Sequence, residues 1–422
     1  MSHAALCSVT LIMLAMTFAM AEPVAVPGAT GHPTYLTHSY SHALVADGED
    51  VYIAYLSNDE KSSSHVVKLD GSTGRWSSPV RIGGGERRDA HYYPNLVMDA
   101  EGYLHVFYGS HCDPLRYRRS SRPRDISAWD RETHPVSIAT YPRPFVLADG
   151  RIIVFMRSGR ERRGPYRYGW VATKDGGVTW SRFHTLIDVP DNAWIPYVGG
   201  VAVEEKPSGA LIAHIAWSWF DYARNEYPSR YEDVLYAAFS LGAHEWSSTE
   251  GGPRPLPATH ATVPPIRRGD DMSVADITVN RFGQPTVLFS ESRIEGEATR
   301  TLIAEFDGFW RIKEPIPDVH LPPSGMRMTL ANGWTTIIGR GSADVGFVIA
   351  QRRDPSGAFV LRQVAGGLDR VPVHPVIVPD SSRELFHIAW TGYSAEAPGQ
   401  LMYTAMPVEP PESAGGGRAR GE

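Results

Sequence analysis

A turn followed by an alternating apolar strand recurs seven times along the chain. Each turn contains Asp, Asn or Gly, and each strand alternates apolar and polar positions, which is the pattern of a half-buried β-strand. The turns lie at 46–50, 99–102, 148–150, 207–209, 280–283, 331–333 and 380–383. Repeats of about 50 residues that hold several strands each are typical of β-propellers. The sequence therefore predicts an all-β fold, a seven-bladed β-propeller built as a single domain.

The two ends of the chain depart from this repeat. Residues 1–21 have the pattern of a signal peptide, with an apolar run and then small residues before the expected cleavage site. We therefore expect a secreted or periplasmic protein. Residues 22–406 are predicted to form the propeller, beginning with a Pro/Gly-rich lead-in at 22–35, and residues 407–422 a disordered tail. A strand at 400–406 should close the last blade, alone or with an N-terminal strand.

Two further segments interrupt the repeat. Residues 173–180, T-K-D-G-G-V-T-W, match the Asp-box turn S/T-x-D-x-G-x-T-W, whose Asp accepts hydrogen bonds from the turn and whose Trp packs inside the fold. Trp76-Ser77 and Trp246-Ser247 resemble the end of the same motif. The Pro/Gly-rich stretch at 250–270 is expected to be an inserted loop.

Charge and cysteine content exclude several classes of protein. The net charge of −6 gives no support for nucleic-acid binding, which requires a clustered basic face. Local basic runs follow the second and third repeats; they are either solvated loops or a means of attracting an anionic substrate. After signal cleavage only Cys112 remains, so we expect no intrachain disulfide, no cysteine-bound zinc and an inert thiol. A monomer that does not bind a membrane is the simplest expectation.

The second repeat carries two histidines at matched positions. Apolar runs at 92–98 and 103–109 flank the turn at 99–102, which predicts a β-hairpin. His91 and His111 are equidistant from that turn. Residues equidistant from a hairpin turn are cross-strand neighbours, so the two side chains should meet at the open end. His105 and His65 lack this symmetry and are interpreted as structural.

The third repeat has the same arrangement with different side chains. Tyr141 and Arg157 are equidistant from the turn at 148–150. In a propeller the open ends of neighbouring inner hairpins gather on one face, where loops on a rigid scaffold usually carry the function. We therefore expect His91, His111, Tyr141 and Arg157 to converge.

These four residue types suit β-elimination at a uronic acid. Arg157 would bind the uronate carboxylate and stabilise the charge that develops when the C5 proton leaves. His91 and Tyr141 would act as base and acid, in an order that the sequence leaves open, and His111 would assist. A matching carboxylate pair and a G-x-S-x-G elbow are absent from the sequence, which argues against ordinary glycoside hydrolysis and serine hydrolase chemistry.

The same residues carry a family resemblance. D-x-H-x-x-P-x-L-x-x-D-x-x-G-Y-L-H-V-F-Y-G-x-H, followed by Y-P-x-P and F-M-R, resembles the BNR-repeat seven-bladed propellers that include ulvan lyases of polysaccharide lyase families 24 and 25. The resemblance implies a lyase acting on ulvan, a sulfated rhamnose–uronate polymer, with catalytic His91, His111, Tyr141 and Arg157. It implies no cofactor for the chemistry and allows a structural metal.

The resemblance also implies a set of substrate contacts. The stretch 217–236 is similar to the family's substrate-lining segment. The expected contacts there are Arg224, Arg230 and Tyr231, to which we add Asn95 in the second repeat.

Three other functions stay open on the same scaffold. One is a rhamnosidase that removes rhamnose from glucuronate with a histidine on the other face, for which His42 or His65 would be the candidates. A second is a sialidase-like hydrolase, suggested by the Asp box. The third is a non-catalytic carbohydrate-binding propeller, which would need Arg157 and aromatic side chains but no His–Tyr pair.

Overall fold

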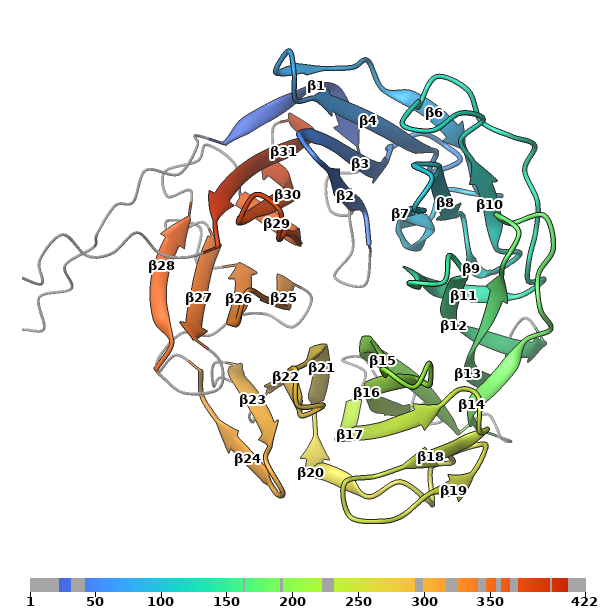
Figure 1. Cartoon of the computed structure of the whole chain (residues 1–422), viewed down its shortest axis with the longest axis vertical. Helices are drawn as coiled ribbons and strands as arrows, with labels where there is room; N and C mark the ends of the chain where they lie inside the picture. The colour runs from blue at the N-terminus through green and yellow to red at the C-terminus, as the bar shows by residue number, and fades with distance from the viewer. Residues whose placement is uncertain are drawn as a thin grey trace, which may run out of the picture.

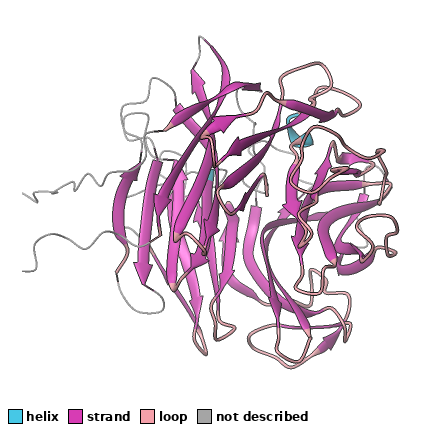
Figure 2. Cartoon of the chain, turned by 45° about the horizontal axis from the view of Figure 1, so that its top comes forward, coloured by secondary structure: helices cyan, strands magenta, loops and turns pink. Residues whose placement is uncertain are grey.

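The fold was analysed in a computed structural model of the whole chain. It describes residues 23–31, 42–161, 164–189, 193–221, 231–292, 299–315, 325–340, 347–353, 358–364, 371–394 and 397–408. The predicted signal peptide and most of the predicted tail lie outside these residues. Within them, no helix is long and apolar enough to cross a membrane. The named elements of the described residues are strands and one short 3-10 turn, η1 (Ala90–Tyr92) (Figure 2).

Seven antiparallel sheets form a closed ring, which confirms the predicted propeller (Figure 1). The innermost strands are β2 (Leu44–Asp47), β7 (Asn95–Met98), β11 (Ala139–Val146), β15 (Trp194–Glu205), β21 (Met272–Val279), β25 (Met326–Ala331) and β29 (Val371–Asp380). The second strands are β3 (Asp50–Leu56), β8 (Leu104–Tyr108), β12 (Ile152–Glu161), β16 (Leu211–Asp221), β22 (Pro285–Glu291), β26 (Trp334–Arg340) and β30 (Leu385–Ser394). Each of the seven predicted turns joins an inner strand to the second strand of the same blade.

The outer strands vary more from blade to blade. The third strands are β4 (Ser64–Asp70), β10 (Arg116–Arg119), β13 (Gly164–Thr173), β17 (Tyr231–Ser240), β23 (Arg300–Phe306), β27 (Phe347–Arg353) and β31 (Ala397–Pro407). Outside them lie β5 (Arg75–Trp76), β6 (Val80–Gly83), β14 (His184–Asp188), β18 (Glu245–Ser247), β19 (Arg254–Pro255), β20 (Pro265–Asp270), β24 (Trp310–Lys313) and β28 (Val360–Val364). One short strand, β9 (His111–Asp113), pairs with β11 on the inner side of blade 3.

The last blade is closed by both ends of the chain. β1 (Val24–Gly31) pairs antiparallel with β31 and becomes the outermost strand of blade 7. The segment expected to be a Pro/Gly-rich lead-in is therefore largely a β-strand, because the exposed edge of β31 offers it hydrogen-bonding partners. β31 itself extends through Pro407, and Val408 beyond it is buried.

Apolar side chains fill every junction between blades. Seven separate hydrophobic clusters correspond to the seven junctions, from the blade 1–2 cluster around Tyr52 and Tyr108 to the blade 7–1 cluster around Ile53 and Ala389. The alternation read from the sequence explains this arrangement, since both faces of each sheet pack on a neighbouring blade.

A buried His–Tyr–carboxylate triad repeats in blades 2, 4 and 7. In blade 2, His105 Nδ1 lies 2.7 Å from Tyr117 Oη and its Nε2 lies 3.0 Å from Asp99 Oδ2. Two other groups have the same order along the chain: Glu204–His214–Tyr236 and Asp380–His387–Tyr403. In the last one His387 Nε2 lies 3.7 Å from Asp380 Oδ2, which is an ion-pair distance and not a hydrogen bond. Each ties the first three strands of one blade together. The structural role predicted for His105 is confirmed, but the repetition of the triad was not foreseen.

The Asp box has the predicted geometry. Asp175 accepts hydrogen bonds from the Thr179 backbone and hydroxyl, at 2.9 and 2.5 Å. Trp180 packs edge-on against Phe107 and Tyr117 of blade 2, so the motif joins two blades. The degenerate copy at Trp76-Ser77 in blade 1 ends with the same serine hydrogen bond. Ser77 Oγ accepts from the backbone of Lys68 nine positions before it, as Ser181 Oγ does from Ala172.

The 250–270 segment is more ordered than an inserted loop. It contains β19 and β20, and β20 pairs with β17 to extend the sheet of blade 4. Leu256 and Ala258 anchor the stretch between these strands through backbone hydrogen bonds to His244 and Leu186. The short pairings explain why no strand was expected, since two- to six-residue strands give little alternation to detect.

The buried histidines should make the fold sensitive to acid. Burial lowers the pKa of His105, His214 and His387 below the ordinary value of 6.5. The unfolded chain takes up these protons below about pH 6.5 while the folded chain resists them. The stability is therefore complete above that pH and is lost below it. Calorimetric melting temperatures should fall as the pH is lowered below about 6.5.

Two variants test the source of this loss. His105→Gln should lower the melting temperature at neutral pH and flatten its decline in acid, because one proton-linked group has been removed. His134→Gln, at an exposed histidine, should change neither quantity. An acid decline that is equally steep in His105→Gln would contradict the assignment.

Candidate active site

The two predicted histidines meet at the open end of the blade 2 hairpin. Their ring centroids lie 4.0 Å apart, with the planes inclined at 31°. Asp89, which had been given no role, holds both rings. His91 Nδ1 lies 2.7 Å from Asp89 Oδ1, and His111 Nδ1 lies 2.7 Å from Asp89 Oδ2. One carboxylate thus bridges two imidazoles and leaves the Nε2 atom of each ring for other partners.

Local chain geometry places the first histidine and its acceptor. Asp89 is the N-cap of η1, where its Oδ1 accepts the backbone N–H of His91 at 2.9 Å. The same oxygen therefore fixes both the backbone and the ring of His91. Gly85 permits this turn, because a Cβ at that position would lie 1.8 Å from the buried ring of Tyr92.

The second histidine belongs to a different blade from the first. After β8 the chain turns at Gly109, whose φ of +64° is in the left-handed region that favours glycine. It then forms β9, which pairs with β11 of blade 3 instead of continuing the blade 2 hairpin. His111 opposes Thr140 there. The predicted meeting with His91 is confirmed, but it takes place across the blade 2–3 junction.

Tyr141 lies at a β-bulge in β11. The β11–β12 register pairs Arg143 with Phe155 but Thr140 with Arg157, so one residue is added between them. The hairpin symmetry had predicted that Tyr141 directly opposes Arg157. The added residue shifts the register, and Thr140 opposes Arg157 instead. Its φ of +58° is rare for a bulky residue, and such local strain is often found at functional sites. The bulge turns the ring toward the histidines, with centroids 6.0 Å from His91 and 6.5 Å from His111.

Arg157 is buried beside this group and is surrounded by tyrosines. It is 4% exposed, and its Cζ lies 4.8, 4.9 and 5.1 Å from the ring centroids of Tyr197, Tyr141 and Tyr166. Its Nε and Nη1 have no hydrogen-bond partner anywhere in the described part of the chain. A buried guanidinium is normally matched by a carboxylate, so these two donors are available to an anionic ligand.

A second acidic group, Asp113, is connected to the histidine pair through Arg87. Asp113 Oδ2 accepts hydrogen bonds from Tyr92 at 2.6 Å and from Arg87 at 3.0 Å. Arg87 also contacts Asp89 at 3.2 Å and the backbone oxygen of His111 at 3.4 Å. Arg87 therefore links the two carboxylates and limits the movement of Asp89.

The electrostatics favour an ionised carboxylate and a neutral imidazole. Burial alone would raise the pKa of Asp89, but hydrogen bonds from His111 and His91 hold it well below its usual range. Burial lowers the pKa of His111, and the bond to Asp89 offsets this only in part. Burial opposes charge on Arg157, yet the facing Tyr197 and Tyr141 raise its pKa. Arg157 is therefore charged at every pH of interest.

The predicted substrate contacts fall into three groups. Tyr231 lies beside the site, because its ring contacts Tyr197 at 5.2 Å and so continues the aromatic path from Arg157. Asn95 is fully buried, and its Oδ1 accepts the backbone N–H of His42 at 2.8 Å. Arg224 and Arg230 lie outside the described residues.

The residues singled out for other functions are not gathered here. His42 Nδ1 lies 3.0 Å from Pro144 O, and burial together with Arg327 and Arg143 lowers its pKa to about 3. His65 stacks on Tyr55 of blade 1. Cys112 is half-buried, with Sγ 3.6 Å from Thr140 Oγ1.

Among the described residues, the potential metal ligands that cluster most tightly are also part of this site. Ligand atoms of Asp89, His91 and His111 lie within 4.8 Å of one another. Both Nδ1 atoms already contact Asp89, so a cation would have to use Nε2 atoms or displace these hydrogen bonds. The arrangement is better suited to holding and moving protons.

The geometry combines an accessible base, a phenol and a fixed cation in one place. His91 and His111 are 38% and 28% exposed at their side chains, whereas Arg157 is buried behind them. A ligand that places an anionic group on Arg157 would bring its neighbouring atoms against Tyr141 and the imidazoles. The signal for Asp89 was present in the D-x-H spacing, but nothing in the sequence indicated that His111 would share it.

Comparison with known proteins agrees with this architecture. A model of the BNR repeat-containing family matches residues 50–316, which is more than half of the chain. The chain belongs to the BNR repeat-containing family. The matched residues run from β3 of blade 1 to β24 of blade 5 and include all four predicted catalytic residues.

Curated relatives of this BNR repeat-containing chain are ulvan lyases. One, from Pseudoalteromonas sp. (strain PLSV), is a family PL25 ulvan lyase that is 26% identical over 245 residues. The match spans 49% of this chain and 48% of that relative. The ulvan lyase of Nonlabens ulvanivorans is 24% identical over 253 residues. The chain thus spans about half the length of the curated relatives it matches.

Solved structures extend the likeness of fold over nearly the whole chain. A PL25 ulvan lyase bound to -[GlcA(1-4)Rha3S]- superposes with a TM-score of 0.71 at 18% identity, covering 92% of this chain and 96% of that one. The polysaccharide lyase Uly1 superposes with a TM-score of 0.72 at 11% identity. At these identities the likeness establishes the shared propeller fold.

The shared carboxylate predicts where both histidines carry a proton. An ionised carboxylate only accepts hydrogen bonds, so His91 and His111 must each carry a proton on Nδ1. Heteronuclear NMR of 15N-histidine-labelled protein should show a protonated Nδ1 for both rings at neutral pH.

His105 is an internal control in the same spectrum. Its carboxylate partner faces Nε2, so its proton should lie on Nε2. Asp89→Asn should alter the His91 and His111 signals and leave those of His105 unchanged. An unprotonated Nδ1 on either His91 or His111 in the wild-type protein would overturn the assignment.

Proposed function

We propose that this protein is a polysaccharide lyase that cleaves a uronate-containing sulfated polysaccharide, with ulvan as the substrate, by β-elimination. The observation that carries the proposal is the buried Arg157, with two unbonded donors next to Tyr141 and the histidine pair. Family membership and the ulvan lyase relatives support the same reaction class.

The first requirement of the reaction is to neutralise the uronate carboxylate. The C5 proton of a uronate is weakly acidic because the carboxylate already carries a negative charge. Nε and Nη1 of Arg157 lie on different edges of the guanidinium, so each can donate its own charge-assisted hydrogen bond to an anionic group. Binding there would stabilise the charge that develops on the carboxylate when the proton leaves.

The second requirement is a pair of proton transfers. One of His91 and Tyr141 removes the C5 proton, and the C–H electron pair forms the C4–C5 double bond. The C4–O4 bond then breaks, and the other residue gives a proton to O4. The two rings lie on different blades and face the same space, so they can reach different atoms of one sugar.

Asp89 and His111 act on this pair from behind. By accepting a hydrogen bond from Nδ1, Asp89 orients His91 so that Nε2 is the nitrogen left to act on the substrate. His111 stacks on His91 and keeps the ring from turning. The chemistry calls for no metal, since Arg157 supplies the positive charge.

The wider assignments follow from the same proposal. Tyr231, Arg224 and Arg230 would contact neighbouring sugars or sulfate groups, whereas Asn95 is fully buried and holds the backbone of His42. Secretion or periplasmic export would bring the protein to a polymer too large to enter a cell, and a monomer would suffice because the four catalytic groups come from one chain.

Elimination has a direct spectroscopic signature. Each cut should create an unsaturated uronate whose conjugated double bond absorbs in the ultraviolet, and hydrolysis creates none. Tyr141→Phe and His91→Ala should each lower kcat by about 10²- to 10⁴-fold, because each removes one proton transfer. Melting temperatures of the variants provide the folding control.

The possible outcomes separate the competing functions. Cleavage of ulvan without ultraviolet absorbance would point to a hydrolase. Polymer binding that persists without cleavage in the wild-type protein would indicate a non-catalytic carbohydrate-binding propeller. Unchanged elimination in Tyr141→Phe would remove that residue from the mechanism.

Arg157 can be tested through the substrate. Arg157→Gln should lower kcat/KM for ulvan by at least about 10²-fold, because the charge-assisted contact to the carboxylate is lost. Carboxyl-reduced ulvan should be a poor substrate for the wild-type protein, and Arg157→Gln should not weaken its cleavage further. A full additional loss on the reduced polymer would show that Arg157 acts elsewhere.

A further inference from the structure

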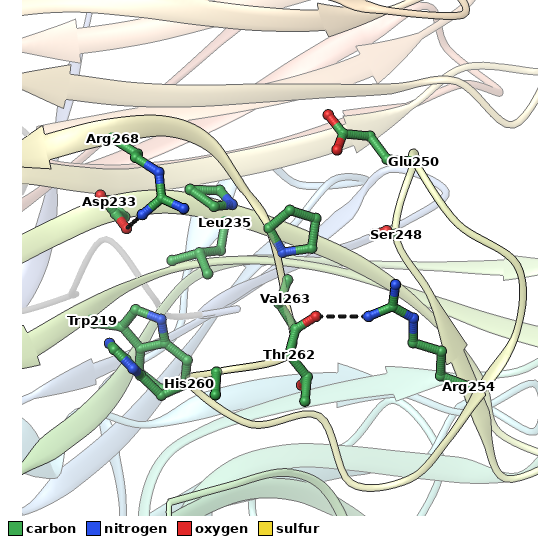
Figure 3. A pocket seen from close by; sticks show the side chains of 13 residues that line it. Trp219, Asp233, Leu235, Ser248, Glu250, Arg254, His260, Thr262, Val263 and Arg268 are labelled. Carbon is green, nitrogen blue, oxygen red and sulfur yellow. Dashed lines mark hydrogen bonds and ion pairs between the residues drawn. The ribbon is translucent and has the colours of Figure 1, made fainter.

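A cleft of about 510 Å³ opens in blade 4, apart from the residues proposed to be catalytic. Its walls are Trp219 of β16, Asp233 and Leu235 of β17, and the 248–268 segment (Figure 3). The volume lies within the range of small-ligand sites. The segment that had been expected to be an inserted loop thus forms one side of a cleft.

The cleft begins at the strand ends that reach toward the catalytic residues. Trp219 pairs with Pro196 of β15 and with Glu232 of β17. The residues next to those partners are Tyr197, which contacts Arg157, and Tyr231. Two strand spacings, about 10 Å, separate β15 from β17. One extended polymer could therefore contact the cleft and the catalytic residues at the same time.

An aromatic surface lines one wall. The exposed ring of His260 stacks on Trp194, with centroids 4.4 Å apart and planes inclined at 17°, and also contacts Trp219 at 5.2 Å. Trp219 is 1% exposed, so it acts as a rigid support. Flat aromatic faces of this kind accept the C–H face of a sugar ring through dispersion and apolar burial.

Two guanidinium groups lie on opposite sides of the cleft (Figure 3). Arg254 packs over the Trp246 ring at 5.3 Å and donates one hydrogen bond, from Nη1 to Thr262 O. Arg268 is 79% exposed at its side chain, and its nearest carboxylate, Asp233, lies 3.9 Å away. Each guanidinium has five N–H donors, so both can donate hydrogen bonds to an anionic group.

The remaining polar groups define what can bind. Asp233 Oδ1 accepts the Gly269 N–H at 3.0 Å and is thereby engaged within the chain. Ser248 is buried, and its Oγ has no partner among the residues described. Glu250, at the exposed rim, is the group that should repel an anion.

We propose that this cleft is a distal subsite that binds a sulfated or carboxylated sugar unit of the polysaccharide, with Arg254 and Arg268 on its anionic group and His260 on its ring. The inference rests on the proposed lyase function and adds a second point of attachment to it. The catalytic residues cut the polymer, and the cleft holds another part of the same chain.

The test measures binding separately from cleavage. In a Tyr141→Phe background, the affinity for ulvan fragments is measured by calorimetry with Arg254→Gln and Arg268→Gln combined. The Kd should rise by about tenfold for fragments long enough to span the cleft and the catalytic residues, because two charge-assisted contacts are lost.

Glu250→Gln should strengthen binding. Arg281→Gln and Arg311→Gln, which remove exposed guanidiniums stacked on Phe282 and Phe309 of blade 5, are the matched controls and should have no effect.

Further arms identify the anionic group and separate the two proposals. If the arginine variants no longer change the Kd of desulfated fragments, the cleft binds a sulfate group. If they no longer change the Kd of carboxyl-reduced fragments, the cleft binds a uronate. An unchanged Kd in the double variant overturns the cleft proposal, even if the wild-type protein produces unsaturated uronate. An arginine-dependent Kd without that product keeps the cleft as a binding site and overturns the lyase.

Discussion

The pairing of β1 with β31 is the constraint on which the rest of the propeller depends. Strands from the two ends of the chain form one sheet, and Gln400 Nε2 secures the contact by donating to the backbone oxygens of Val26 and Ala29. The entropic cost of closing a ring grows only slowly with chain length. The pairing also covers one edge of β1 and one edge of β31 that would otherwise be exposed. Because the ring is closed, every blade is packed on both sides and its inner strand cannot shift alone.

The candidate site depends on that rigidity because no single blade contains it. His91 lies at the entry to blade 2, Tyr141 and Arg157 lie in blade 3, and Tyr197 lies in blade 4. The β9 strand connects the first two by leaving one sheet for the next. Asp89 then bridges His91 and His111 across the junction. A small rotation of one blade would separate groups whose spacing decides whether protons can be transferred.

The site also holds two unfavourable features that the scaffold must stabilise. Arg157 is buried without a carboxylate, and three tyrosine rings provide only part of the compensation that water or an anion would supply. Tyr141 has a left-handed backbone conformation at a bulge. An anionic ligand on Arg157 would supply the missing compensation, so part of the stability given up by burying the guanidinium would return as binding affinity. The blade 4 cleft differs, because its arginines are exposed and its contribution would be attachment alone.

The amino-acid sequence by itself determined the number of blades, the seven inner hairpins and the four residues that gather at one end of two of them. These features follow from local rules, since turn chemistry and two-residue alternation are set by neighbouring residues. The pairing of His111 with blade 3, the bulge at Tyr141, the Asp89 bridge and the His–Tyr–carboxylate triads were decided by tertiary structure. Each depends on contacts between strands far apart in the chain, which alternation does not record. The cleft under residues 248–268 belongs to the same class, because its walls come from strands that only the folded sheet of blade 4 brings together.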